Sequence, residues 1–175
     1  EVKHTPAQPV DRSITLAKYI EVWLEQVAPK KLAASTLSRD RQDIRRILPA
    51  LGHYKLTELN KEILRDFYDA MRQERNENTG HLLAEGTVEG IHSCLCGILS
   101  DAVEAGYITH NPAWQAYKKK GISKERPVAD EETVQRLIAA LETQSLKYEV
   151  YYKLILATGM RRGEACGLRW SDIDW

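Results

Sequence analysis

Two arginines follow a glycine in the segment Thr158-Gly159-Met160-Arg161-Arg162-Gly163-Glu164. An arginine side chain is a planar, permanently charged fork that can hold two oxygens of a phosphate group as negative charge builds up on them. A short helix is expected to open after Gly159, and its first backbone N–H groups would also favour an anion. The pattern therefore predicts phosphate chemistry at residues 161–164, although two solvated arginines at a helix start would look the same.

Two clusters of basic residues stand out in a chain whose net charge is zero, with 25 Lys and Arg against 25 Asp and Glu. Taken as a total, this neutrality argues against a nucleic-acid-binding protein. Residues 30–46, however, contain six bases and two acids, and residues 118–126 contain five bases and one acid. Such clusters create a local electrostatic footprint for a polyanion, so the neutral total does not exclude DNA as a partner.

The composition argues against several other classes of protein. No apolar run approaches the roughly 20 residues that a bilayer-spanning helix needs, and residues 1–9 lack the apolar core of a secretory signal. Three cysteines are too few for a disulfide scaffold and favour a reducing compartment, so we expect a cytoplasmic protein. Cys94 and Cys96 do not have the spacing of a zinc site, and we expect neither a metal nor a cofactor.

Apolar residues recur with helical spacing through the first two thirds of the chain. We expect one helix over residues 13–28 with Ser13 as its N-cap, and a second that begins after Ser35 and ends near Gly52. A third helix follows the predicted cap Asn60, and a fourth covers residues 85–105. Four helices with short connections predict a compact bundle.

A basic stretch bounded by Gly and Pro divides the chain. We expect a disordered or extended segment over residues 1–12, a helical domain over 13–113, a basic linker over 114–127 and a second domain from 128 to 175. Residues 128–175 are too few to close a core alone, so the second domain is expected to be cut off. Residues 170–175 alternate in polarity as a strand does.

Two blocks of sequence resemble the tyrosine recombinases of the phage-integrase type. The first block is similar to the helical core-binding domain of that family and comprises Ser13–Leu24, Ser35-Thr36-Leu37, Ile47–Gly52, Thr87-Val88 and Asn111-Pro112. The second block, Leu156–Asp174, resembles the first catalytic motif of the family. The resemblance covers nearly the whole chain. It implies a mainly α fold, with a four-helix SAM-like core-binding bundle followed by a truncated, mostly helical start of the α+β catalytic domain.

The resemblance implies an enzyme that cuts and rejoins double-stranded DNA through a 3′-phosphotyrosyl link, without a metal, as a tetramer on DNA. On the family pattern Arg161 is the catalytic arginine, ahead of Arg162, and Glu164 orients the site or caps the turn. The nucleophilic tyrosine of the family lies downstream of this motif. Tyr148, Tyr151 and Tyr152 fall in an apolar helical stretch, where core packing is expected, so we expect these 175 residues not to cleave DNA.

The family resemblance also implies a clamp with one domain on each face of the duplex. On the second predicted helix, the arginines lie opposite the apolar stripe or on its flanks. Small residues at 90, 93 and 97 would permit close approach of another helix or of DNA. We expect DNA contacts from Lys31, Thr36, Arg39, Arg41, Arg45, Arg46, Thr87, Lys118, Lys119 and Lys120. The alternatives are a helical protein-interaction bundle and a non-catalytic DNA-binding regulator.

Overall fold

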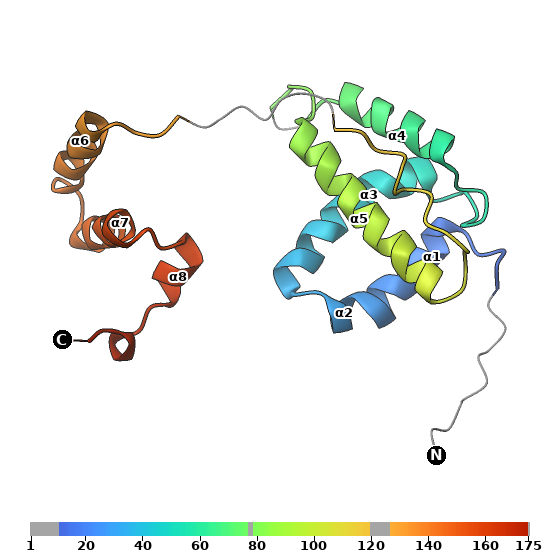
Figure 1. The fold of residues 1–175 in the computed structure, drawn as a ribbon, viewed down its shortest axis with the longest axis horizontal. Coiled ribbons are helices and arrows are strands. Elements are labelled where there is room, and N and C mark those ends of the chain that lie inside the picture. The colour runs from blue at the N-terminus through green and yellow to red at the C-terminus, as the bar shows by residue number, and fades with distance from the viewer. Residues whose placement is uncertain (1–10, 77–78, 120–126, 175) are drawn as a thin grey trace, which may run out of the picture. The chain divides into compact units, whose positions relative to one another are not determined.

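A computed structural model describes residues 11–76, 79–119 and 127–174, and the chain divides into two compact units, up to Ile122 and from Ser123 onward (Figure 1). The described residues form helices and turns with two isolated β-bridges and no strand. The predicted mainly α fold is therefore confirmed. No helix within these described ranges is long and apolar enough to cross a membrane.

Five α-helices build the first unit, and a π-helical turn joins the first two (Figure 1). Helix α5 packs on both α3 and α4, while α1 packs on α3. The predicted apolar face of α5 forms the centre of the core, and six of its side chains are fully buried. The helices are α1 (Leu16–Val22), α2 (Ala28–Lys31), α3 (Ala34–Leu51), α4 (Lys61–Gln73) and α5 (Glu85–Glu104). The six buried residues of α5 are Val88, Ile91, Leu95, Ile98, Leu99 and Ala102.

Two of the predicted helix ends are confirmed by their hydrogen bonds and backbone angles. The Asn60 side chain accepts a hydrogen bond from the Ile63 N–H at 3.0 Å and caps α4. Gly106 follows α5 with a φ of +81°, a left-handed conformation that suits a residue without a Cβ. These two ends fix the lengths of the helices that carry most of the core.

The prediction of one continuous helix over residues 13–28 is wrong at both ends. Ser13 bonds to Asp11 instead of capping, and Thr15 caps α1 by accepting a hydrogen bond from the Lys18 N–H. Further along, Pro29 has no N–H to continue an α-helical ladder. The chain widens into a π-helical turn, in which the Ala28 N–H donates to the Trp23 carbonyl. The helical run passes through this turn into the short α2 and ends at Lys31.

Two carboxylates lie in the contact between α3 and α5. Asp40 and Asp43 are only 6% and 8% exposed, and the Asp43 carboxylate lies 3.8 Å from where a Cβ on Gly90 would stand. Burial raises the pKa of both acids, and the charge of Asp40 adds to the increase in the pKa of Asp43. Each group therefore favours the protonated form in the folded protein more than in the unfolded chain.

Replacing Asp43 by Asn is therefore expected to raise the melting temperature at pH 7. An acid whose folded pKa is raised costs stability above that pKa, and the cost disappears as the pH falls below the unfolded value of 3.8. The gain should shrink in melts recorded from pH 7 toward pH 4. Asp66→Asn, an exposed change on α4, is the matched control. A lower melting temperature for Asp43→Asn at pH 7 would contradict this account.

The second unit contains three α-helices and a final turn. Asp130 caps α6 (Glu131–Leu141) by accepting a hydrogen bond from the Thr133 N–H at 2.9 Å. Helices α7 (Leu146–Thr158) and α8 (Arg162–Gly167) follow. Among the apolar side chains that the structure describes in this unit, only Leu141 is buried. The unit therefore has very little core of its own, as its length predicts.

Two predictions for the second unit are wrong. Tyr148 and Tyr152 are 54% and 46% exposed and are not packed in a core within the described residues, whereas Tyr151 is half-buried with its hydroxyl 4.0 Å from the Cys166 thiol. Residues 170–172 form a 3-10 turn where a strand was expected. A strand needs a partner for its backbone groups, whereas this turn satisfies its own, with the Asp172 N–H donating to the Arg169 carbonyl at 2.9 Å.

Candidate functional site

The arginines of α3 lie on two flanks of its exposed face. Successive residues of an α-helix are turned by about 100°, which puts Arg39 and Arg41 about 160° apart. Arg45 follows Arg41 on one flank, and Arg46 follows Arg39 on the other. Arg39, Arg41 and Arg45 are exposed, and Arg39 extends past the buried acids, with its Nε 3.8 Å from the Asp40 carboxylate. The helix therefore presents positive charge to both sides.

Thr36 and Thr87 lie where α3 and α5 begin. Thr36 is half-buried in the first turn of α3, and Thr87 is half-buried in the first turn of α5. The small residues of α5 divide into two groups. Gly90 faces Asp43 on α3, whereas Gly97 faces open space and Ser93 is exposed. The close approach predicted for Gly90 is therefore a contact between helices.

Four of the predicted DNA-binding residues that the structure describes have a carboxylate within 4.0 Å, namely Lys31, Arg39, Arg46 and Lys119. The Arg46 Nε lies 3.3 Å from Glu74 at the end of α4, and the Arg46 side chain is 29% exposed. The Lys31 Nζ lies 2.7 Å from Asp101 and 2.9 Å from Glu104. The hydrogen bond to Asp101 is the largest cause that raises the pKa of Lys31, and the hydrogen bond to Glu104 is the next largest. By contrast, no carboxylate lies within 4.0 Å of Arg41 or Arg45 among the residues that the structure describes.

Lys31→Ala is therefore expected to lower the melting temperature of the first unit without changing its salt-dependent affinity for DNA. Asp101 also accepts a hydrogen bond from the indole Nε1 of the buried Trp23 at 2.7 Å, so Lys31 joins α2 to the end of α5. Thermal melts and duplex titrations test the two effects separately. Lys18→Ala, an exposed lysine on α1, is the control. A weaker salt dependence for Lys31→Ala than for Lys18→Ala would instead place Lys31 at DNA.

The first part of the predicted linker packs against the first unit. Ala116 is buried, and Tyr117 contacts both α4 and α5. Lys118 and Lys119 are exposed, and the Lys119 Nζ lies 2.8 Å from Glu89 on α5. Lys120 lies outside the described residues. The domain limits themselves stay a prediction, but residues 114–119 are held on the bundle.

Arg161 and Glu164 are paired at the start of α8. Gly159 ends α7 with a φ of +69°, and Arg161 is the N-cap of the next helix. The Arg161 N–H donates to Glu164 at 2.8 Å, and its guanidinium donates to the other oxygen of the same carboxylate at 3.2 Å. The Arg161 side chain is 88% exposed. Glu164 thus caps the turn and orients a guanidinium that can reach an outside ligand, whereas Arg162 is the first residue of the helix.

The three cysteines have different surroundings. Cys94 is buried and its thiol lies 3.8 Å from the Asp40 carbonyl, and burial raises its pKa. Cys96 is half-buried and Cys166 is exposed. Among the described residues, no three His, Cys, Asp or Glu side chains gather in a way that could hold a metal ion.

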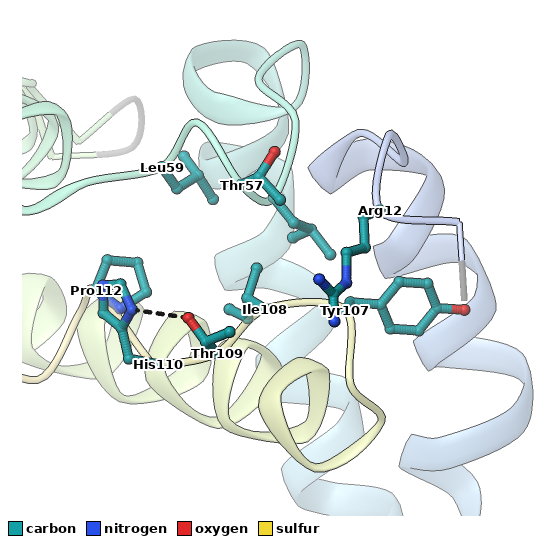
Figure 2. A pocket seen from close by; sticks show the side chains of 9 residues that line it. Arg12, Thr57, Leu59, Tyr107, Ile108, Thr109, His110 and Pro112 are labelled. Carbon is teal, nitrogen blue, oxygen red and sulfur yellow. Dashed lines mark hydrogen bonds between the residues drawn. The ribbon is translucent and has the colours of Figure 1, made fainter. Parts of the chain in front are cut away.

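A pocket of about 140 Å³ lies at the opposite end of α5 from Thr87 (Figure 2). It is bounded by Arg12, by the segment that precedes α4 and by the loop that follows α5, where Thr109 and His110 are hydrogen bonded at 3.3 Å. The walls of this pocket come from three loops without a shared sequence motif, so the sequence alone does not predict it. None of the predicted DNA-binding residues lines it.

Comparison with known proteins relates both units to one family. Residues 15–72 match the N-terminal SAM-like domain of phage integrases, and residues 127–175 match the phage integrase family. The integrase of Escherichia phage lambda is 24% identical over 165 residues, which are 93% of this chain and 43% of that protein. A XerC-like tyrosine recombinase of Caldanaerobacter subterraneus is 22% identical over 172 residues, which are 94% of this chain and 42% of that protein.

Solved structures show the same fold. A lambda integrase tetramer bound to a Holliday junction matches 99% of this chain and 50% of its own with a TM-score of 0.73 at 20% identity. A lambda integrase dimer bound to a COC′ core site gives a TM-score of 0.72 over 93% of this chain and 44% of its own. The chain thus spans about two fifths of the length of the curated relatives it matches. With two matching blocks in the family's order, this chain belongs to the phage integrase family of tyrosine recombinases.

Proposed function

We propose that this chain is the DNA-binding part of a site-specific tyrosine recombinase, with α3 lying in the major groove of duplex DNA. The observation that carries the proposal is the pair of basic flanks on α3. A helix in the major groove, which is about 12 Å wide, has a phosphate backbone on each side. Arg39 on one flank and Arg41 with Arg45 on the other match that arrangement, because each flank can neutralise the phosphates of one strand.

Further phosphate contacts are proposed from residues outside the exposed face of α3. Thr36 lies in the first turn of α3 and Thr87 in the first turn of α5, where a hydroxyl can donate to a phosphate oxygen. Lys118 is exposed and can follow the DNA backbone, and Lys119 can do so by exchanging Glu89 for a phosphate. Arg46 can reach DNA by exchanging Glu74 for a phosphate. Lys31 is left out of this proposed surface because two carboxylates of α5 hold its ammonium group.

Arg161 is the proposed catalytic residue of the full-length recombinase. The full-length enzyme would cut and rejoin DNA through a 3′-phosphotyrosyl link and act as a tetramer on DNA, as family membership suggests. Glu164 already orients the Arg161 guanidinium, whose exposure leaves its remaining N–H donors able to bind a scissile phosphate. This part of the proposal needs no group other than the side chains of the protein.

The chain of 175 residues is expected to bind duplex DNA but to form no covalent adduct with it. The proposed nucleophilic tyrosine lies in sequence beyond the motif around Arg161. Incubation with duplex and nicked DNA followed by denaturing gel electrophoresis checks this expectation. A relative that carries the whole catalytic domain is the positive control. A DNA-linked band from the 175-residue chain would contradict it.

Duplex titration by fluorescence anisotropy tests the DNA-binding proposal against a protein-interaction bundle. A phosphate-binding surface loses affinity as salt rises, because bound counterions are released when the complex forms. An interaction bundle would show no salt-dependent affinity for the duplex. A non-catalytic DNA-binding regulator would bind equally well, but its full-length form would form no adduct, so the two assays together separate all three functions.

A further inference from the structure

Tyr117 is enclosed by side chains from α4 and α5, although it belongs to the segment assigned to the linker. Its ring stacks on the His92 ring with centroids 4.6 Å apart and an angle of 15° between planes. The Tyr68 ring is nearly perpendicular to it with centroids 5.5 Å apart, and the Arg72 guanidinium carbon lies 5.5 Å from the Tyr117 ring centroid. Its hydroxyl donates to the Glu85 carboxylate at 2.9 Å. The Tyr117 ring therefore has two aromatic partners and one cationic partner, and its hydroxyl has a hydrogen-bond partner.

Arg72 connects this ring to the backbone of the same segment. Its Nε and Nη2 donate to the two oxygens of Glu85 at 3.0 and 2.9 Å, and its Nη1 donates to Asp69 at 2.8 Å. The same Nη2 donates to the carbonyl of Lys118 at 3.0 Å. The Arg72 side chain is only 14% exposed, so water does not compete strongly with these bonds. One arginine thus holds Glu85, Tyr117 and the backbone at Lys118 in a single arrangement.

The protonation states of the cluster suit these contacts at neutral pH. Burial, together with the Glu85 carboxylate, raises the pKa of Tyr117 to about 12, so its hydroxyl remains a donor. Burial lowers the pKa of His92, which favours a neutral ring stacked on Tyr117. The neutral His92 Nδ1 lies 3.0 Å from the Tyr68 hydroxyl. No proton needs to move for the cluster to form.

We propose that Tyr117, Arg72, Glu85 and His92 form an anchor that fixes the backbone at Lys118 and Lys119 against the bundle. The inference rests on the proposed function, because its purpose would be to preorganise Lys118 and Lys119 for contact with the DNA backbone. Lys119 lies 2 residues after Tyr117 in the sequence. Its ammonium group is paired with Glu89, close to the start of α5. A segment that is already ordered loses less conformational entropy when it binds. Tyr117 is therefore a positioning residue, which need not touch DNA itself.

Tyr117→Ala should weaken duplex binding by about five- to tenfold, in line with the ordering cost of a few side chains and backbone bonds. The slope of log K against log[salt] should stay unchanged, because every lysine and arginine is still present. Hydrogen exchange of a peptide covering residues 114–119 should become faster, while exchange in α5 stays slow. Tyr117→Phe, which removes only the bond to Glu85, should show a smaller effect of the same kind.

Two controls keep the test independent of folding. Val103→Ala, in the half-buried part of α5 far from residue 117 in sequence, lowers stability without touching the anchor and should leave the duplex affinity unchanged. Arg72→Lys keeps the charge but loses the bidentate grip on Glu85, so it should accelerate exchange and weaken binding even if Tyr117→Ala does not fold.

The outcomes separate this inference from the proposed function. Failure of the unsubstituted chain to bind duplex DNA would overturn both. Normal binding by the unsubstituted chain, with faster exchange but the same affinity in Tyr117→Ala and Arg72→Lys, would overturn the anchor alone. Unchanged exchange at residues 114–119 in both variants would also overturn it, because the contacts would then not be what holds the segment. Weaker binding with an unchanged salt slope and faster exchange supports it.

Discussion

Replacing Arg161 by Ala in the full-length recombinase is expected to slow strand cleavage by at least about 10²- to 10³-fold, the usual effect of removing a donor that stabilises transition-state charge. The affinity for duplex DNA should change little, because the arginines of α3 are intact. The physical reason is the fork of the guanidinium, which can hold two phosphate oxygens at once. Single-turnover cleavage assays at saturating protein measure the chemical step separately from binding.

Variants of the neighbouring residues sharpen the Arg161 test. Arg162→Ala removes the adjacent charge and should cost much less than Arg161→Ala. Glu164→Gln removes the charge that pairs with Arg161 but keeps an oxygen for the Arg161 N–H, so it should give an intermediate loss of cleavage. Equal cleavage rates for Arg161→Ala and the unsubstituted enzyme would remove Arg161 from the catalytic machinery, and a larger loss for Arg162→Ala would assign the role to Arg162.

Removing the exposed arginines from either flank of α3 is expected to flatten the salt dependence of duplex binding. Each phosphate contact contributes about 0.9 to the slope of log K against log[salt]. Arg39→Ala should therefore reduce the slope by about 0.9, and the double variant Arg41→Ala with Arg45→Ala by about 1.8. Anisotropy titrations at several salt concentrations give these slopes directly.

The two flanks make distinct predictions about how α3 lies on DNA. If only one set of substitutions changes the slope, the helix lies along one strand and the groove arrangement is wrong. If neither set changes it, α3 does not face DNA at all. Arg12→Ala, beside the pocket in Figure 2 and away from α3 in the sequence, is a control that removes a positive charge elsewhere.

Helical periodicity predicted the core of the first unit well, because apolar spacing and caps act over a few residues. The buried faces of α4 and α5 and the Asn60 cap follow directly from local sequence. The π-helical turn at Trp23–Val27 was not predicted, because the apolar spacing continues through these residues. The only sequence signal for the turn is Pro29, which lacks the N–H that an α-helix needs. The strand expected at residues 170–175 failed because alternation alone cannot supply a hydrogen-bonding partner.

The candidate site was predicted as a list of bases, but the sequence could not show which of them have partners. Lys31 pairs with acids some 70 residues away, and Arg46 pairs with one 28 residues away. Such pairs depend on tertiary packing, so charge counting along the chain treats paired and exposed bases alike. For the same reason the sequence did not predict the contact between Arg72 and Tyr117, which lie in different segments and meet only in the folded unit.

The central claim, that the exposed face of α3 lies against duplex DNA, is tested most directly by site-specific photo-cross-linking. A photoreactive amino acid at Gln42, which lies on the exposed face between the two flanks, leaves all the arginines in place. The same amino acid at exposed Glu58, in the loop before α4, is the control. We predict that ultraviolet light links position 42 to the duplex in a salt-sensitive manner and does not link position 58. Efficient cross-linking at position 58 with none at position 42 would contradict the account.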